Sequence, residues 1–353
     1  SASASTTDGD ANSTSDVGES LGSQLSNLTV GGIGTLSGLS NLTSSSDASS
    51  VVGAADALAS LDLAEGLGIE AKLTVASDAT VVGTTTIGST ADASTTNGKA
   101  TATSTSDVIT GADLSGGMVD IGGISSIAGQ ANFDLSASST NVSGSGKPKG
   151  KDDLADATAK ANSADATGLI GGKGGFGIDV ASDSDLSGIT IGSMTTDASS
   201  TAGSADASAG SQNTLQDEVI GAELPSLKVG GVSNLTGAAQ LDASATSSNV
   251  DNVANTSDSV LQTLNAWALA GQSLSVTGLT SGESGEDINI EADGTTTIAA
   301  PSFNDQFNID ITSDSALTAQ AFSNLDATAS SIANLALAGA GAGRPSGDRK
   351  SVV

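Results

Sequence analysis

The sequence contains no Cys, no His and no Tyr, and only one Trp, five Phe and four Pro among its 353 residues. Without Cys and His, thiolate nucleophiles, Ser-His-Asp relays and zinc sites built from these residues are excluded. The shortage of aromatic rings argues against a compact enzyme, whose core normally depends on large side chains. The 11 Lys and Arg stand against 40 Asp and Glu, so a net charge of −29 argues against binding to a nucleic-acid backbone. We therefore expect neither an enzyme nor a nucleic-acid-binding protein.

Long apolar runs are also missing, and no segment approaches the 18 residues that indicate a membrane-spanning helix. The chain begins at Ser1 without Met, which fits removal of a secretory signal, and we expect a secreted, extracellular or cell-surface protein. The composition nevertheless differs from that of disordered chains, because hydrophobic residues make up 37% and charged residues only 14%. The sequence predicts an ordered structure with a thin core of Val, Ile, Leu and Ala.

Internal repetition is the strongest positive signal. One motif places a Gly-Gly pair between aliphatic residues, and it occurs three times with the same downstream spacing, at Gly31-Gly32, Gly122-Gly123 and Gly230-Gly231. A second motif alternates with it, and its marker glycines are Gly83, Gly188 and, in a weaker copy, Gly294, about 105 residues apart. We expect an all-β protein in which tandem repeats of about 105 residues form stacked β modules or a β-solenoid.

Local patterns support this prediction. Apolar residues alternate with polar ones in the segments around Leu73 and Ile178, as in β-strands. The Gly-Gly pairs are expected in bulges or turns at positive φ. Two Ala-rich segments, 54–67 and 253–269, have helical spacing, so short helices and further strands remain alternatives there.

The repeats predict a division of the chain into successive segments. These are an extended N-terminal arm (1–29), an N-terminal half-repeat (30–68), two full repeats (69–168 and 169–272), a C-terminal partial repeat (273–343) and a tail (344–353).

One segment suggests metal chemistry. Residues 174–182 read Gly-Gly-Phe-Gly-Ile-Asp-Val-Ala-Ser, which resembles the calcium-binding RTX repeat. The resemblance implies calcium bound between successive turns, but the motif stands alone here and Ala181 fills its large aliphatic position. The candidate calcium ligands are Asp179, Asp183 and Asp185, and a purely structural loop is the alternative. No other cofactor is expected.

The order of the two motifs suggests a function. The chain opens on one half-repeat and closes on the other, so two copies could complete each other end to end, and such non-closing contacts generate filaments. We expect a structural subunit of an extracellular filament, sheath or surface layer, which polymerises head-to-tail with itself through β-strand contacts. The alternative is a repeat adhesin or a calcium-stabilised surface stalk.

Overall fold

The computed structural model describes residues 1–142, 156–171, 177–201, 205–209, 218–223, 226–231, 233–249, 255–261, 263–268, 273–276, 280–281, 291–293, 308–311, 315–331 and 336–342. Every regular element in these ranges is a β-strand, and they contain no helix. The helical alternative for the Ala-rich segments is therefore wrong. Residues 54–67 fall almost entirely in strand β4 (Ala55–Val75), and 253–269 contain β16 (Asn255–Leu261) and β17 (Thr263–Ala268).

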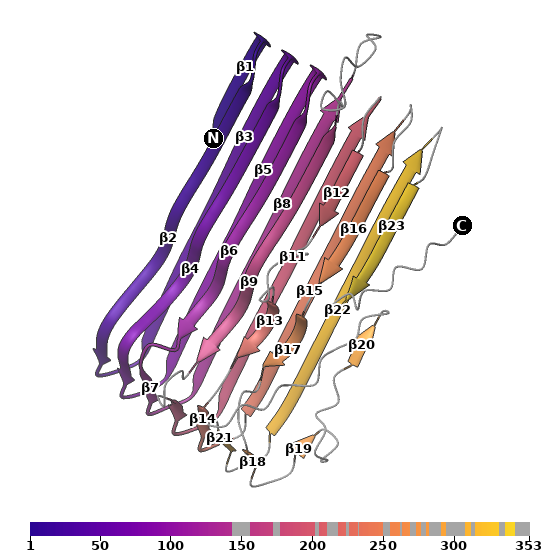
Figure 1. The fold of residues 1–353 in the computed structure, drawn as a ribbon. Coiled ribbons are helices and arrows are strands. Elements are labelled where there is room, and N and C mark those ends of the chain that lie inside the picture. The colour runs from indigo at the N-terminus through magenta and orange to yellow at the C-terminus, as the bar shows by residue number, and fades with distance from the viewer. Residues whose placement is uncertain are drawn as a thin grey trace.

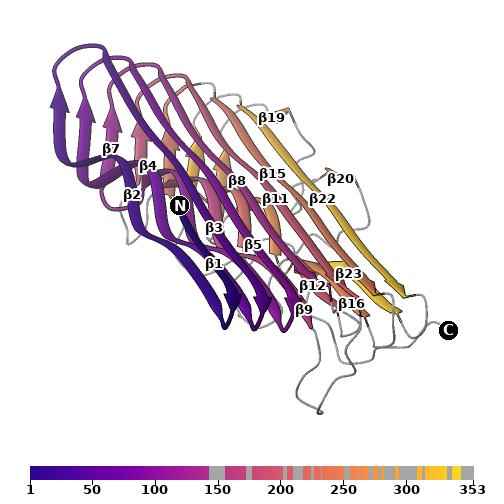
Figure 2. The same ribbon diagram turned by 90° about the horizontal axis from the view of Figure 1, so that it is seen from above.

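The strands form two parallel sheets that face each other (Figure 1, Figure 2). Sheet A contains, in spatial order, β1 (Ala2–Asp8), β3 (Gly34–Val52), β5 (Ala79–Asn97), β8 (Ser125–Asn141), β11 (Ser184–Ser200), β15 (Ser233–Asn249) and β22 (Ser315–Ser331), with β19 (Thr280–Ser281) and β20 (Glu291–Asp293) on β22. Sheet B contains β2 (Ala11–Val30), β4, β6 (Ala100–Leu114), β7 (Met118–Ile121), β9 (Ala157–Gly171), β10 (Ile178–Val180), β12 (Ala205–Ala209), β13 (Glu218–Glu223), β14 (Ser226–Val229), β16, β17, β18 (Ser273–Val276), β21 (Asn308–Ile311) and β23 (Ala336–Ala342).

The repeating unit is a rung, which we define as one passage of the chain through sheet A and then sheet B. Equivalent residues of successive rungs pair in register. We call such a line of paired residues across the strands of one sheet a row, and one row consists of Gly38, Gly83, Gly129, Gly188 and Gly237. Its members are 45, 46, 59 and 49 residues apart, so the spacing of about 105 residues spans two rungs. The predicted fold class is therefore wrong: two continuous parallel sheets of long strands replace modules of about 105 residues.

Residue alternation explains why these segments form strands between two sheets. In β4, Ala55, Ala57 and Ala59 are buried between the sheets, whereas Asp56 and Leu58 are exposed on the outer face. Successive side chains of a strand point to opposite faces, so this pattern of period two places small apolar residues inside. The same alternation recurs in β3, β5 and β8, and it keeps the core one side chain thick on each sheet.

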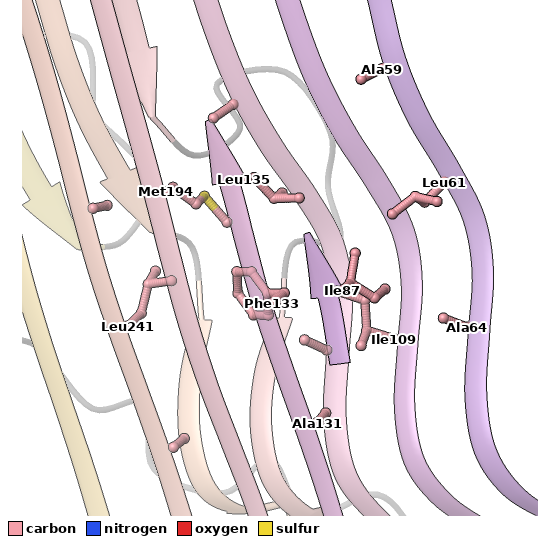
Figure 3. Close-up of a cluster of buried hydrophobic side chains, with 14 of the residues drawn as sticks. Ala59, Leu61, Ala64, Ile87, Ile109, Ala131, Phe133, Leu135, Met194 and Leu241 are labelled. Atoms are coloured by element: carbon pink, nitrogen blue, oxygen red, sulfur yellow. The ribbon is translucent and has the colours of Figure 1, made fainter. Parts of the chain in front are cut away.

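Larger side chains form a cluster in one part of the interior (Figure 3). Ile87, Phe133 and Leu241 are buried in one row of sheet A, and Leu61 and Ile109 on sheet B are buried in the same hydrophobic cluster. Dispersion contacts and removal of apolar surface from water stabilise this region.

The two sheets touch backbone to backbone along a line of facing glycines, which we call the glycine line. A Cβ on Gly83 would overlap the carbonyl oxygen of Gly111, and one on Gly188 would overlap that of Gly221. In the opposite direction, a Cβ on Gly66 would lie 2.5 Å from the backbone nitrogen of Thr84. No side chain fits at this contact, which explains why Gly83 and Gly188 recur in the sequence.

The Gly-Gly pairs lie in the turns from sheet B to sheet A, but their conformation differs from the prediction. Among the described residues, the glycines at positive φ are Gly9, Gly53 and Gly98, in the turns from sheet A to sheet B. The pairs instead provide space for a carboxylate of the preceding rung. A Cβ on Gly123 would overlap Asp78 Oδ1 and lie 2.7 Å from the Asp78 nitrogen, and the Ile124 N–H donates to that carboxylate at 3.0 Å.

The other predicted repeat positions follow the same logic where the structure describes them. Gly122 lies beside the Ala76 backbone, and Gly230 and Gly231 lie beside Ala181 and Asp183 in the same way. Turns with Gly-Gly and turns with Asp alternate along the stack, so no such Asp carboxylate lies against another. This alternation creates the two-rung period. Gly294 lies outside the described residues.

Candidate assembly surface

The N-terminal end of the stack exposes strand edges. Strand β2 pairs with β4 alone, and β1 covers only Ser46–Val52 of β3. Within the described residues, the outward edge of β2 and of residues 34–45 therefore has no neighbouring strand (Figure 1). Residues 1–29, which the sequence predicted as an extended arm, form β1 and nearly all of β2. An unpaired strand edge is a template for another strand.

The apolar interior is open at the same end. Six hydrophobic side chains are only partly buried while packing against the core, and all lie on the two strands with open outer edges, β2 and β3: Val17, Leu25, Leu28, Val30, Leu36 and Leu42. Their partners one rung further on are fully covered, as shown by Leu73 beside Leu28, which is 0% exposed, and Val75 beside Val30, which is 1% exposed. The difference arises because no described strand covers the outer edge of β2 or of residues 34–45 of β3.

Two glycines at this end differ from the equivalent glycines of later turns in their surroundings. A Cβ on Gly31 or Gly32 would meet no atom within 4 Å, whereas a Cβ on Gly122 or Gly123 would collide with the preceding rung. The first turn thus has open space on the side where later turns contact the preceding rung.

The C-terminal end is partly covered. Strand β18 lies on β21, while β19 and β20 lie on the first half of β22. Beyond Phe322, the remaining edge of β22 and the edge of β23 have no further partner among the described strands. Figure 1 shows the N-terminal strands and β22–β23 at opposite ends of the stack.

One carboxyl group stands out electrostatically. Glu65 on β4 is 8% exposed, and Gln24 Nε2 donates to its Oε2 at 3.4 Å. Burial, followed by the negative charge of Asp113, raises the pKa of Glu65 to about 7, against the hydrogen bond from Gln24, which lowers it. Glu65 is thus a titratable group in the middle range of pH.

A second carboxyl group reflects the in-register stacking. Asp92 on β5 lies directly beside Asp47 on β3. Burial, followed by the negative charge of Asp47, raises the pKa of Asp92. Like charges in one row oppose the stacking of rungs, and further along this row Ser138 separates Asp92 from Asp197.

The three candidate calcium ligands do not converge. Asp179 lies in β10, Asp183 in the following turn and Asp185 in β11. Asp185 Oδ1 accepts a hydrogen bond from Asn234 Nδ2 at 2.7 Å, and Asp183 lies against Gly231 of the next rung. No cluster of three acidic residues in the described chain could hold a metal ion. Residues 172–176, which contain the start of the RTX-like motif, lie outside the described residues.

The comparisons give no relative: no family model, curated protein or solved structure matches this chain. Among the described residues, no helix is long and apolar enough to cross a membrane. The open end of the stack is therefore the feature that points most directly to a function. The sequence analysis did not single out the six partly buried core residues at this end, because their inward orientation depends on the rung register.

Proposed function

We propose that this protein is a structural subunit that assembles end to end into an extracellular filament, sheath or surface layer. The observation that carries the proposal is the set of six partly exposed apolar side chains on β2 and β3, from Val17 to Leu42, beside unpaired strand edges. A further rung from another copy would bury these side chains and pair these edges. Burial of apolar surface and the completed backbone hydrogen bonds would both stabilise the contact.

The two ends of the stack differ, so the contact is heterologous. The N-terminal end of one copy meets the C-terminal end of another, and each addition leaves the same two ends free. Since all strands are parallel, this arrangement continues both sheets without reversing their direction. Such contacts produce an open polymer rather than a closed dimer.

The outer faces suit a hydrated polymer. The outward row beginning at Ser49 continues as Ser94, Thr140, Ser199 and Ser248, so it consists of hydroxyl groups. With a net charge of −29, electrostatic repulsion between the sides of neighbouring polymers favours growth at the ends over lateral clumping.

A charge placed inside the first rung tests the proposal. Leu28→Lys puts an ammonium group on the open interior, where a free chain leaves it partly in water but an added rung would bury it. We expect electron microscopy and sedimentation to show loss of filaments, with little change in the melting temperature. The matched control is Thr29→Lys, because Thr29 is exposed on the outer face.

Filaments of undiminished number and length from Leu28→Lys would contradict the proposal. A wild-type protein that remains monomeric at high concentration and at high ionic strength would contradict it as well. Val17→Lys provides a second variant, at the first of the six partly exposed side chains.

A further inference from the structure

The C-terminal end of the stack carries the first half of an additional strand. Strand β19 places Thr280 and Ser281 beside the start of β22, and β20 continues as far as Phe322. In the described chain, nothing pairs with the same edge from residue 323 to 331. The half-strand therefore stops at the row of Asn41, which runs through β5, β8, β11 and β15 to Phe322.

The N-terminal end carries the second half. Strand β1 begins with Ala2 beside Ser46, and the row of Ser46 runs through the stack to Ala327. The first half thus ends in the row of Asn41 and the second begins in the row of Ser46. The two halves do not overlap, and four rows separate them.

The next turn also matches. Thr6 of β1 belongs to the row of Ser331 in β22, and Asn12 of β2 belongs to the row of Leu337 in β23. Both steps, from Thr6 to Asn12 and from Ser331 to Leu337, span six residues. A second copy can therefore engage both sheets at once, with β1 on β22 and β2 on β23.

We infer that the joint between two copies is a composite strand, in which β1 of one copy completes the strand that β19 and β20 of the other begin. This inference rests on the proposed function and adds which strands meet and in which register. The Ser5 position of one copy then lies beside Ser330 of the other, since both belong to the row of Ser49 and Ser94. The same joint places β3 of the incoming copy on β19 and β20.

Cysteine cross-linking can test the register directly, because the chain contains no Cys. The double variant Ser5→Cys with Ser330→Cys places two thiols at paired positions of neighbouring strands. The Cα atoms of such a pair are about 5 Å apart, within the range for a disulfide. Under mild oxidation of assembled protein, we expect a ladder of covalent multimers on a non-reducing denaturing gel. The ladder should collapse to monomer on reduction.

Two matched variants complete the design. Ser49→Cys with Ser94→Cys occupies one row within a single chain and should form an intramolecular disulfide, which shows that the chemistry works at this spacing. Ser5→Cys with Asn324→Cys shifts one thiol by six residues, roughly 20 Å along the strand, and should remain uncross-linked.

The outcomes separate the inference from the proposed function. Filaments that form but do not cross-link through Ser5→Cys with Ser330→Cys, while the intramolecular pair does, would overturn the register alone. Covalent dimers of the single variant Ser5→Cys would show N-terminal ends meeting each other and would also overturn it. Absence of any assembly by the wild-type chain would overturn both.

Discussion

Gly192 on β11 leaves space for the ring of Phe133 on β8. A Cβ at Gly192 would overlap Cζ of that ring and lie 2.5 Å from Cε1. The two residues occupy neighbouring positions of one row, which continues to Ile87 on one side and Leu241 on the other. The widest side chain of the row is thus accommodated by the absence of a side chain in the next rung.

This relationship predicts a coupled pair. We expect Gly192→Ala to destabilise the protein by about 1–3 kcal/mol, because the buried ring cannot move away without disturbing its neighbours. Combined with Phe133→Leu, the same change should cost less than the sum of the two single variants, by about 0.5–3 kcal/mol. A double-mutant cycle measured by denaturant unfolding checks this, and simple additivity would contradict the assigned contact.

The glycine line predicts a position-specific cost along a single strand. Gly83→Ala forces a methyl group into the backbone of the facing sheet at Gly111. We therefore expect the free energy of unfolding to fall by about 3 kcal/mol or more, the upper end of the usual cost of overpacking. Gly88→Ala on the same strand is the control, because its Cβ would meet Thr43 Cγ2 at 3.6 Å, an ordinary contact. Thermal unfolding of both variants should differ clearly, and equal melting temperatures would show that the sheets do not touch at Gly83.

Part of this architecture was readable from the sequence. The alternation of Ala55, Asp56 and Ala57 has a period of two, so a strand could have been preferred over a helix there. The two repeat motifs looked unrelated because their turns differ, and only the register shows Gly38 and Gly83 in one row. Unequal rung lengths further hid the shorter period.

The candidate surface was only partly predictable. The order of the repeat halves predicts that two copies could complete each other, but the partial exposure of Leu28 depends on the absence of a covering strand in the described chain. The burial of Glu65 had no signal in the sequence, because residues 64–69 of β4 are all buried, so the alternation that marks inward positions elsewhere does not hold there. Figure 2 shows the two sheets between which such residues lie. Asp183 and Asp185 are close in sequence, yet their contacts are with different residues of the next rung.

Glu65 predicts a pH-dependent stability. Its folded pKa of about 7 lies above the ordinary value of 4.5, so folding favours the protonated form. The contribution of Glu65 to the free energy of unfolding is therefore most favourable below pH 4.5. It decreases as the pH rises from 4.5 to about 7 and is constant above about pH 7. Glu65→Gln should match the wild type near pH 4 and melt at a higher temperature near pH 8. Glu19→Gln is the control, because Glu19 is exposed. A melting-temperature difference between Glu65→Gln and the wild type that stays the same from pH 4 to pH 8 would refute the raised pKa of Glu65.

The first Gly-Gly turn separates assembly from folding. Gly32→Ala should leave the melting temperature of the monomer unchanged, because nothing lies within 4 Å of the added Cβ. Gly123→Ala should destabilise the monomer, since its Cβ would lie 2.7 Å from the Asp78 nitrogen and 2.8 Å from the Ser77 carbonyl carbon. If another copy stacks on the first rung as rungs stack within the chain, the methyl group of Gly32→Ala meets the backbone of that copy at the joint. We therefore expect fewer and shorter filaments from a normally folded monomer, measured by light scattering and electron microscopy. Wild-type assembly by Gly32→Ala would mean that the first turn meets no neighbour in the polymer.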